Sequence, residues 1–233
     1  MDTSSPLFVL YIILGIVALI AAFVVWVYRA AKKQQQERRR LIQEFGFQEA
    51  PERTRDLTER MKTLHHHWTE HHGLDGVKRK SEWGYELLLF DLQDSSGDST
   101  HTESDQGVLI APDLKLPRFT MFPKMQGTGL VAAMTNKALG WIASRFAVQA
   151  KFPDAPEFDA KYLVWGDDEA ALRECFSPAR LARLAETEEL QAEGSGDALL
   201  FSRVPFHRVK QTYEEKLREI LQNAKLLFEI FKT

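Results

Sequence analysis

Cysteine is almost absent from this chain of 233 residues, since Cys175 is the only one. A single thiol excludes an intrachain disulfide and a metal cluster held by thiolates. The same scarcity agrees with a reducing compartment. Cys175 lies next to Phe176 and near Leu172 in a predicted helix, which indicates a buried, inert thiol rather than a nucleophile.

The chain also lacks an excess of positive charge. Its 30 Lys and Arg residues stand against 33 Asp and Glu residues, for a formal net charge of −3. The stretch from Arg29 to Arg40 concentrates basic residues, so the remainder of the chain is acidic. An acidic domain lacks the basic surface that binds phosphate backbones. We therefore expect no nucleic-acid partner.

Several enzyme motifs are missing, among them a P-loop, a redox CxxC pair and a Ser-His-Asp pattern. Gly127, Gly129 and Ala132 match the loose spacing of a dinucleotide loop, but no buried strand precedes them and the next acidic residue is Asp154. The acidic stretch 94–105 lacks the ligand order of an EF-hand. These patterns predict no catalytic residue and no cofactor.

What the chain does have is an uncharged apolar run from Leu7 to Tyr28. At about 1.5 Å per residue, a helix of this length crosses the roughly 30 Å hydrocarbon core of a bilayer. The run therefore predicts a transmembrane helix over 7–28, preceded by a short extracytoplasmic N-terminus over 1–6. One face of this helix carries mostly small side chains that would admit a partner helix, namely Tyr11, Gly15, Ala18 and Ala22.

Basic residues follow the apolar run directly, whereas none precedes it. Because positive charge stays on the cytoplasmic side, we expect a single-pass protein of the inner membrane with its N-terminus outside and the bulk of the chain in the cytoplasm. Residues 29–50 form a basic juxtamembrane stalk in this interpretation. Its side chains are predicted to contact anionic lipid headgroups, through Arg29, Lys32, Lys33, Arg38, Arg39 and Arg40.

The predicted fold class is α+β: one N-terminal transmembrane helix, then a cytoplasmic domain over 51–233 in which helices cover antiparallel strands. Helical spacing of apolar residues predicts helices over 56–72 and 209–231. Branched and aromatic runs around polar loops predict two hairpins, over 82–111 and 190–204. Leu116 to Phe122 is predicted as an edge strand, because prolines at 117 and 123 cannot donate to a ladder.

Two further apolar segments predict a surface for a partner or for the membrane. The segment 129–146 has unusually low polarity for a helix, and the last turns of the C-terminal helix are apolar nearly all round. A buried core is the open alternative for this C-terminal end. The predicted surface residues are Leu130, Met134, Trp141, Leu227, Phe228 and Phe231.

Histidines crowd into the sequence LHHHWTEHHG, over residues 64–73. On a helix, His67 and His71 would be four residues apart on one face, a spacing at which two imidazoles can share a metal ion. The order differs from the HExxH motif of zinc proteases, and a third ligand would have to come from elsewhere. The alternative is a solvated helix face whose charge changes with pH.

The order of several motifs resembles a group of bacterial single-span membrane proteins with a cytoplasmic α+β domain and no assigned activity. The similarity covers a strand pair with a Gly/Ser/Thr loop, a later Tyr-x-Val-x-Gly-x-Asp-Glu-Ala segment and the late hairpin EGSGDALLF. The histidine segment and 129–146 depart from the group. The matching positions are Phe90, Asp91, Gly97, Gln106, Val108, Phe158, Tyr162, Val164, Gly166, Asp168, Glu169, Ala170, Phe176 and Pro178.

Taken together, these features predict a non-enzymatic accessory or stabilising subunit of a larger membrane assembly, such as a respiratory, photosynthetic or transport complex. Its expected partners are other membrane protein subunits and anionic lipid headgroups. The alternative is a membrane-tethered protein that responds to metal or pH, or a hydrolase, centred on the histidines over 65–72.

Overall fold

The computed structural model describes residues 6–66, 68–82, 84–95, 101–124, 146–203 and 211–232. Side chains are not described at 6–13, 15, 17, 18, 104 and 203. The chain divides into two compact units, Met1–Gly46 and Phe47–Thr233.

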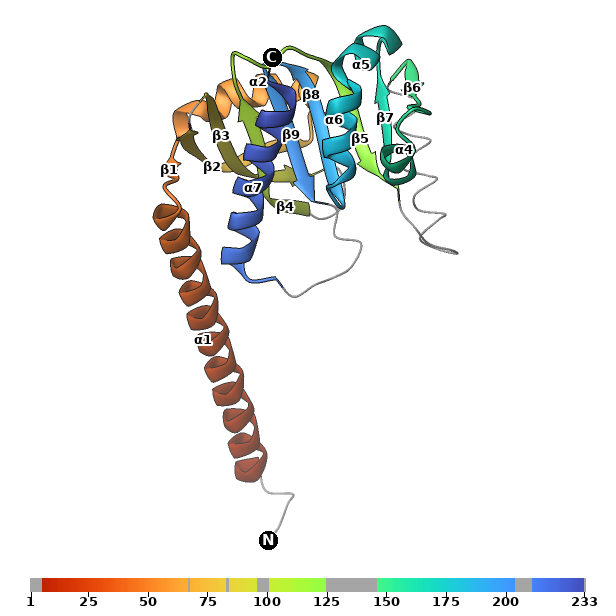
Figure 1. Cartoon of the computed structure of the whole chain (residues 1–233). Coiled ribbons are helices and arrows are strands. Elements are labelled where there is room, and N and C mark those ends of the chain that lie inside the picture. The colour runs from red at the N-terminus through yellow and green to blue at the C-terminus, as the bar shows by residue number, and fades with distance from the viewer. Residues whose placement is uncertain are drawn as a thin grey trace. The chain divides into compact units, whose positions relative to one another are not determined.

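The first unit contains one long helix, α1 (Pro6–Glu44), which joins the predicted apolar helix and its basic stalk (Figure 1). Within the described part of the chain, no helix combines the length and the apolar character that a membrane crossing requires. The apolar part of α1 ends at Tyr28, and Arg29 then opens a charged stretch within the same helix. The predicted transmembrane helix over 7–28 is therefore wrong. The single-pass topology and the location in the inner membrane are wrong with it.

The side chains of α1 that the structure describes are mostly exposed. Ala22 is exposed, whereas the side chains of Tyr11, Gly15 and Ala18 lie outside the described set, so the predicted partner face of α1 stays a prediction. The basic residues from Arg29 to Arg40 are exposed except for Arg38, which is half-buried. Their contact with anionic headgroups stays a prediction.

The second unit confirms the predicted α+β class with antiparallel strands. Its described residues form one antiparallel sheet of nine strands in the order β1-β2-β3-β4-β9-β8-β5-β7-β6 (Figure 1). The sheet ends in a strand of two residues at one edge and of three residues at the other. The strands are β1 (Gln48–Glu49), β2 (His72–Glu82), β3 (Tyr85–Asp94), β4 (His101–Ile110), β5 (Leu116–Pro123), β6 (Val148–Ala150), β7 (Tyr162–Gly166), β8 (Leu190–Gly196) and β9 (Ala198–Arg203).

Helices cover both faces of this sheet. The helix α2 contacts β2, β8 and β9 on one face, and α7 lies over β4 and β9 on the other, beside α6 (Figure 1). The helical segments of the unit are η1 (Pro51–Arg53), α2 (Thr54–Leu64), α4 (Pro156–Lys161), α5 (Glu169–Cys175), α6 (Pro178–Ala185) and α7 (Tyr213–Phe231).

Both predicted hairpins are present, as β3 with β4 and β8 with β9. The prediction of β5 as an edge strand is wrong, because β5 pairs with β8 on one side and with β7 on the other. The strand β5 can contain two prolines inside the sheet because of where they lie in it. Pro117 falls within a register shift against β8, and Pro123 is the last residue of the strand. Neither proline therefore has to donate inside a regular ladder.

The helix α2 ends at Leu64, well before the predicted end at residue 72. Its apolar face, Leu57, Met61 and Leu64, packs on alternate residues of the strands below. The same core cluster contains Val77, Leu88, Phe90, Leu92, Val108, Ile110, Ala198 and Leu200. Burial of this face fixes α2 against the sheet, and the residues that follow it emerge directly over β8.

The apolar last turns of the C-terminal helix α7 are part of the core. Leu227, Phe228 and Phe231 are buried, so their prediction as a partner or membrane surface is wrong. Phe231 packs against Phe119 of β5, with ring centroids 5.8 Å apart, and against Phe176 at the C-terminal end of α5, with ring centroids 5.7 Å apart. The other predicted surface residues, Leu130, Met134 and Trp141, lie outside the described residues.

Two interactions set the start of α7 at Tyr213, four residues beyond its predicted start at residue 209. Thr212 and Glu215 form a capping box, in which each side chain binds the backbone N–H of the other. The buried Asp105 of β4 then anchors the first turns: its carboxylate accepts a hydrogen bond of 2.9 Å from Tyr213 Oη and lies 3.1 Å from Lys216 Nζ.

Candidate metal centre

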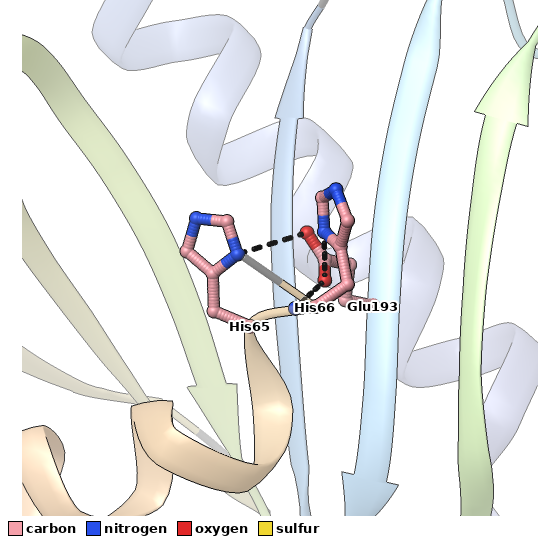
Figure 2. A group of neighbouring side chains, drawn as sticks. All are labelled: His65, His66 and Glu193. Carbon is pink, nitrogen blue, oxygen red and sulfur yellow. Dashed lines mark hydrogen bonds and ion pairs between the residues drawn. The ribbon is translucent and has the colours of Figure 1, made fainter. Parts of the chain in front are cut away.

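One group of metal-ligating side chains meets where α2 ends over the sheet. His65, His66 and Glu193 each offer a ligand atom, and these atoms all lie within 4.8 Å of one another. Figure 2 shows the two neighbouring imidazoles, whose ring centroids are 5.1 Å apart, both turned toward the carboxylate of Glu193. Among the described residues this is the group with the geometry to hold a metal ion.

The two histidines reach this position because the helix stops one residue before them. His65 is extended, with φ −81° and ψ 117°, while its N–H still bonds to the carbonyl of Met61. The chain therefore leaves the helical path and turns across the sheet surface. Consecutive histidines thereby face the same carboxylate, which they would not do as neighbours on a helix.

Glu193 comes from the middle of the sheet. It lies on β8, opposite Thr120 of β5 and Leu200 of β9. Its side chain is only 1% exposed, on the face that α2 covers. Burial of a carboxylate on an apolar face costs several kcal/mol unless charge and hydrogen bonds compensate it.

His66 supplies most of that compensation. One oxygen of Glu193, Oε2, accepts a hydrogen bond of 2.6 Å from the His66 backbone N–H and lies 2.6 Å from His66 Nδ1. The other oxygen, Oε1, accepts a longer bond of 3.3 Å from Gln191 Nε2 and lies 3.7 Å from His65 Nδ1. The separation from His65 is too long for a hydrogen bond.

The pKa of Glu193 reflects this competition. Burial acts to raise its pKa, but the hydrogen bonds from His66 and the positive charge available on His66 and His65 together outweigh burial. The pKa therefore lies below the ordinary value of a glutamate, and Glu193 is an anion at neutral pH. A carboxylate and two imidazoles are ligands that a transition metal binds. The same three groups can also form an ion pair when an imidazole is protonated.

The distances can be compared with those that a metal requires. In tetrahedral geometry, with each ligand atom about 2.1 Å from zinc, the ligand atoms lie about 3.4 Å apart. The 3.7 Å between His65 Nδ1 and Glu193 Oε1 suits such a site. The 2.6 Å between His66 Nδ1 and Glu193 Oε2 is shorter, because a proton holds these two atoms together. A metal ion would replace this proton and spread the pair by less than about 1 Å.

A polar cavity of about 210 Å³ lies beside the two histidines. It joins the end of α2 to the start of β2 and to the loop end of the β3–β4 hairpin, where Asp94 pairs with His101. Its lining contains four imidazoles and two carboxylates, from His65, His66, His72, Asp94, His101 and Glu103, together with Leu92. Residues that are distant in sequence thus surround one small space.

His72 is held in this wall in a defined orientation. Its Nδ1 accepts hydrogen bonds from the Thr69 backbone N–H, at 3.1 Å, and from Thr69 Oγ1, at 2.8 Å. These bonds assign the ring proton of neutral His72 to Nε2. The ring also lies edge-on to His65, with centroids 5.9 Å apart. His72 thus supports the position of His65.

The metal pair expected from sequence is not the group that the structure brings together. His67 lies outside the described residues, and the side chain of His71 is 52% exposed, with Glu70 3.9 Å away. The helix that would have aligned His67 with His71 ends at Leu64. A metal site on this pair stays a prediction.

Sequence reasoning missed Glu193, His65 and His66 as one site. The available signal was weak: Glu193 interrupts a predicted hairpin, and the pairing of that hairpin places it opposite the apolar Leu200. A carboxylate on an apolar sheet face needs a partner. Nothing in the local sequence identifies that partner as a residue 127 positions away.

Cys175 has the environment expected of an inert thiol. Burial, partly offset by nearby Arg180, raises its pKa to about 11. A thiol with this pKa is protonated at neutral pH and contributes neither a nucleophile nor a metal ligand. Arg180 instead binds backbone carbonyls of Cys175 and of Ile230, which ties the end of α5 to the end of α7.

Comparison of the chain with protein families, with curated proteins and with solved structures finds no match. The resemblance to bacterial single-span proteins accordingly stays a prediction.

Proposed function

We propose that this protein binds a divalent transition metal, zinc above all, through His65, His66 and Glu193. The observation that carries the proposal is the fully buried carboxylate of Glu193 between two imidazoles from another element, with ligand atoms within 4.8 Å. Two imidazoles and one carboxylate form a ligand set that zinc uses with an open fourth position. This proposal develops the metal-responsive alternative with a different set of ligands.

Metal titration of protein prepared without an affinity tag tests this proposal. After treatment with a chelator, we expect the chain to bind one zinc ion in competition with a chromophoric chelator. Glu193→Gln and His65→Ala are expected to weaken binding by at least about 100-fold, since even the loss of a supporting residue costs 10–100-fold. Glu193→Gln keeps the shape of the side chain while removing its charge.

His71→Ala is the matched control, because His71 is exposed and lies outside the proposed centre. Its zinc affinity is expected to equal that of the unmodified chain. The proposal is contradicted if zinc does not bind stoichiometrically. It is also contradicted if His71→Ala loses zinc while Glu193→Gln retains it, which would favour the pair His67 and His71 instead.

A second candidate function is that of an accessory or stabilising subunit of a larger protein assembly. It is supported by the exposed apolar surface of α1, where ten large side chains between Leu14 and Tyr28 are 43–72% exposed. Contiguous apolar surface of this kind marks an interaction site. Because apolar side chains point to every side of the helix, the expected partner is a protein that presents apolar helices around it.

Site-specific cross-linking tests this second function. A photoreactive residue in place of Trp26 is expected to capture one defined partner protein in cells, because Trp26 lies within the exposed apolar stretch. The same residue in place of Lys33, which is exposed on the basic part of α1, serves as the control. Cross-links only to further copies of this chain, or none at position 26, would reject the accessory role.

A further inference from the structure

The cavity beside the metal centre is open to the two histidines but not to the carboxylate. His65 and His66 line it, whereas Glu193 belongs to the sheet beneath and is buried. Three protein ligands occupy three of the four positions around a tetrahedral metal ion. With Glu193 below and the imidazoles at the sides, the fourth position faces the cavity.

The lining also determines which ligands the cavity suits. Asp94 and Glu103 place two carboxylates at its rim, and His72 and His101 add polar rings without a permanent charge. A divalent metal ion with Glu193 carries a net charge of about +1, and the two lining carboxylates bring the sum to about −1, so the site as a whole favours a positively charged ligand over an anion. At about 30 Å³ per water molecule, a volume of 210 Å³ corresponds to roughly seven waters. This space accommodates a ligand of a few heavy atoms and is smaller than sites for drug-sized molecules.

We propose that the metal centre keeps an exchangeable fourth position, and that the cavity admits small cationic ligands with a metal-coordinating nitrogen. The coordinating nitrogen would replace a metal-bound water, while the positive group would lie near Asp94 and Glu103. This inference rests on the proposed metal binding. It assigns the centre to the class of metal sites that exchange ligands, in contrast to closed structural sites.

Cobalt substitution makes this proposal measurable. Co²⁺ has a visible absorption that changes with its ligands, and it is expected to occupy the same donor set as zinc. Three probes share one coordinating ring and differ in the charge of the attached group: imidazole is neutral, histamine carries an ammonium and imidazole-4-acetate carries a carboxylate. At low ionic strength, histamine is expected to bind at least about tenfold more tightly than imidazole-4-acetate.

Substitutions at the rim test the origin of this preference. The double variant Asp94→Asn, Glu103→Gln is expected to reduce the histamine preference to within about twofold while cobalt binding persists. Glu70→Gln is the matched control, since Glu70 is 88% exposed and does not line the cavity. This control is expected to leave the preference unchanged.

The possible outcomes separate this inference from the metal proposal. Failure to bind cobalt would reject the proposed function itself. Cobalt that binds, and is lost in Glu193→Gln, but whose spectrum is unchanged by all three probes would establish a closed site and overturn the inference alone. Equal affinity for the three probes, or an unchanged preference in the rim double variant, would overturn the cationic selectivity.

Discussion

Replacing His66 by alanine is expected to lower the free energy of unfolding by about 3 kcal/mol in metal-free buffer at neutral pH. The substitution removes the imidazole whose Nδ1 lies 2.6 Å from a carboxylate that is only 1% exposed. A buried polar group left without its hydrogen-bond partner costs about 1–3 kcal/mol, and more if the group is charged, as Glu193 is. The His66 backbone N–H still binds Glu193 and limits the loss. Urea denaturation followed by circular dichroism measures the change.

A second substitution tests whether the buried charge of Glu193 causes this loss. Adding Glu193→Gln to His66→Ala is expected to recover at least about 1 kcal/mol, because a buried neutral amide without a partner costs less than a buried carboxylate without one. A loss below about 1 kcal/mol for His66→Ala alone, or no recovery in the double variant, would contradict the assignment of His66 as the compensating partner.

The pH dependence of this loss follows from the lowered pKa of Glu193. The ionised carboxylate stabilises the fold fully above the ordinary glutamate pKa of about 4.3, and this contribution declines as the pH falls through the lower pKa of the folded state. The stabilities of the unmodified chain and of His66→Ala are therefore expected to converge in acid. Denaturation at a series of pH values within the same experiment shows whether they do.

Replacing Phe176 by alanine is expected to lower the free energy of unfolding by about 3–5 kcal/mol, the range for buried phenylalanines. Phe176 is 1% exposed at the end of α5. Its ring lies edge-on to Phe119, with centroids 5.0 Å apart, and 5.7 Å from Phe231. The substitution would open a cavity where β5, α5 and α7 meet. The same denaturation measurement gives the change.

Phe23→Ala is the matched control for this prediction. The two substitutions remove the same atoms, but Phe23 is 63% exposed on α1. Its replacement is expected to change stability by less than about 0.5 kcal/mol. Equal effects of the two substitutions would contradict the assignment of the aromatic group around Phe176 as the core of this face.

Much of the second unit could be predicted from local sequence. The polar loops between branched and aromatic runs identified both hairpins, and the apolar spacing from Leu217 to Phe231 identified α7. These features depend on residues close in sequence. The end of α7 was less certain, because an apolar surface that packs on a core and one that packs on a partner have the same composition.

The site depended on contacts that are remote in sequence. Leu57, Met61, Leu64 and Trp68 have a helical spacing, yet the helix stops at Leu64, where the His66 N–H binds Glu193 instead of continuing the helical ladder. Likewise, no single segment of the sequence specifies the strand order that places β8 under α2. Local periodicity predicted a histidine helix for this reason, and tertiary contact overrode it.

Two other predictions failed because a local property was read without its surroundings. The apolar composition of 7–28 predicted a membrane crossing that no described helix supports. The prolines of β5 predicted an edge, but a register shift and a strand end remove them from the regular ladder. Such a shift cannot be inferred before the neighbouring strand is known.

The two shortest strands of the sheet have a consequence for the behaviour of the protein at high concentration. A long flat border would offer rows of free backbone donors and acceptors on which another polypeptide could align. Among the described residues, the outermost strands of the sheet are Gln48–Glu49 on one side and Val148–Ala150 on the other. The strand β1 pairs only with Lys78 and Arg79 of β2, so the remaining border of β2 needs other protection. A register shift between Asp75 and Lys78 interrupts that border, and β2 carries several charged side chains, two features that oppose pairing with another polypeptide.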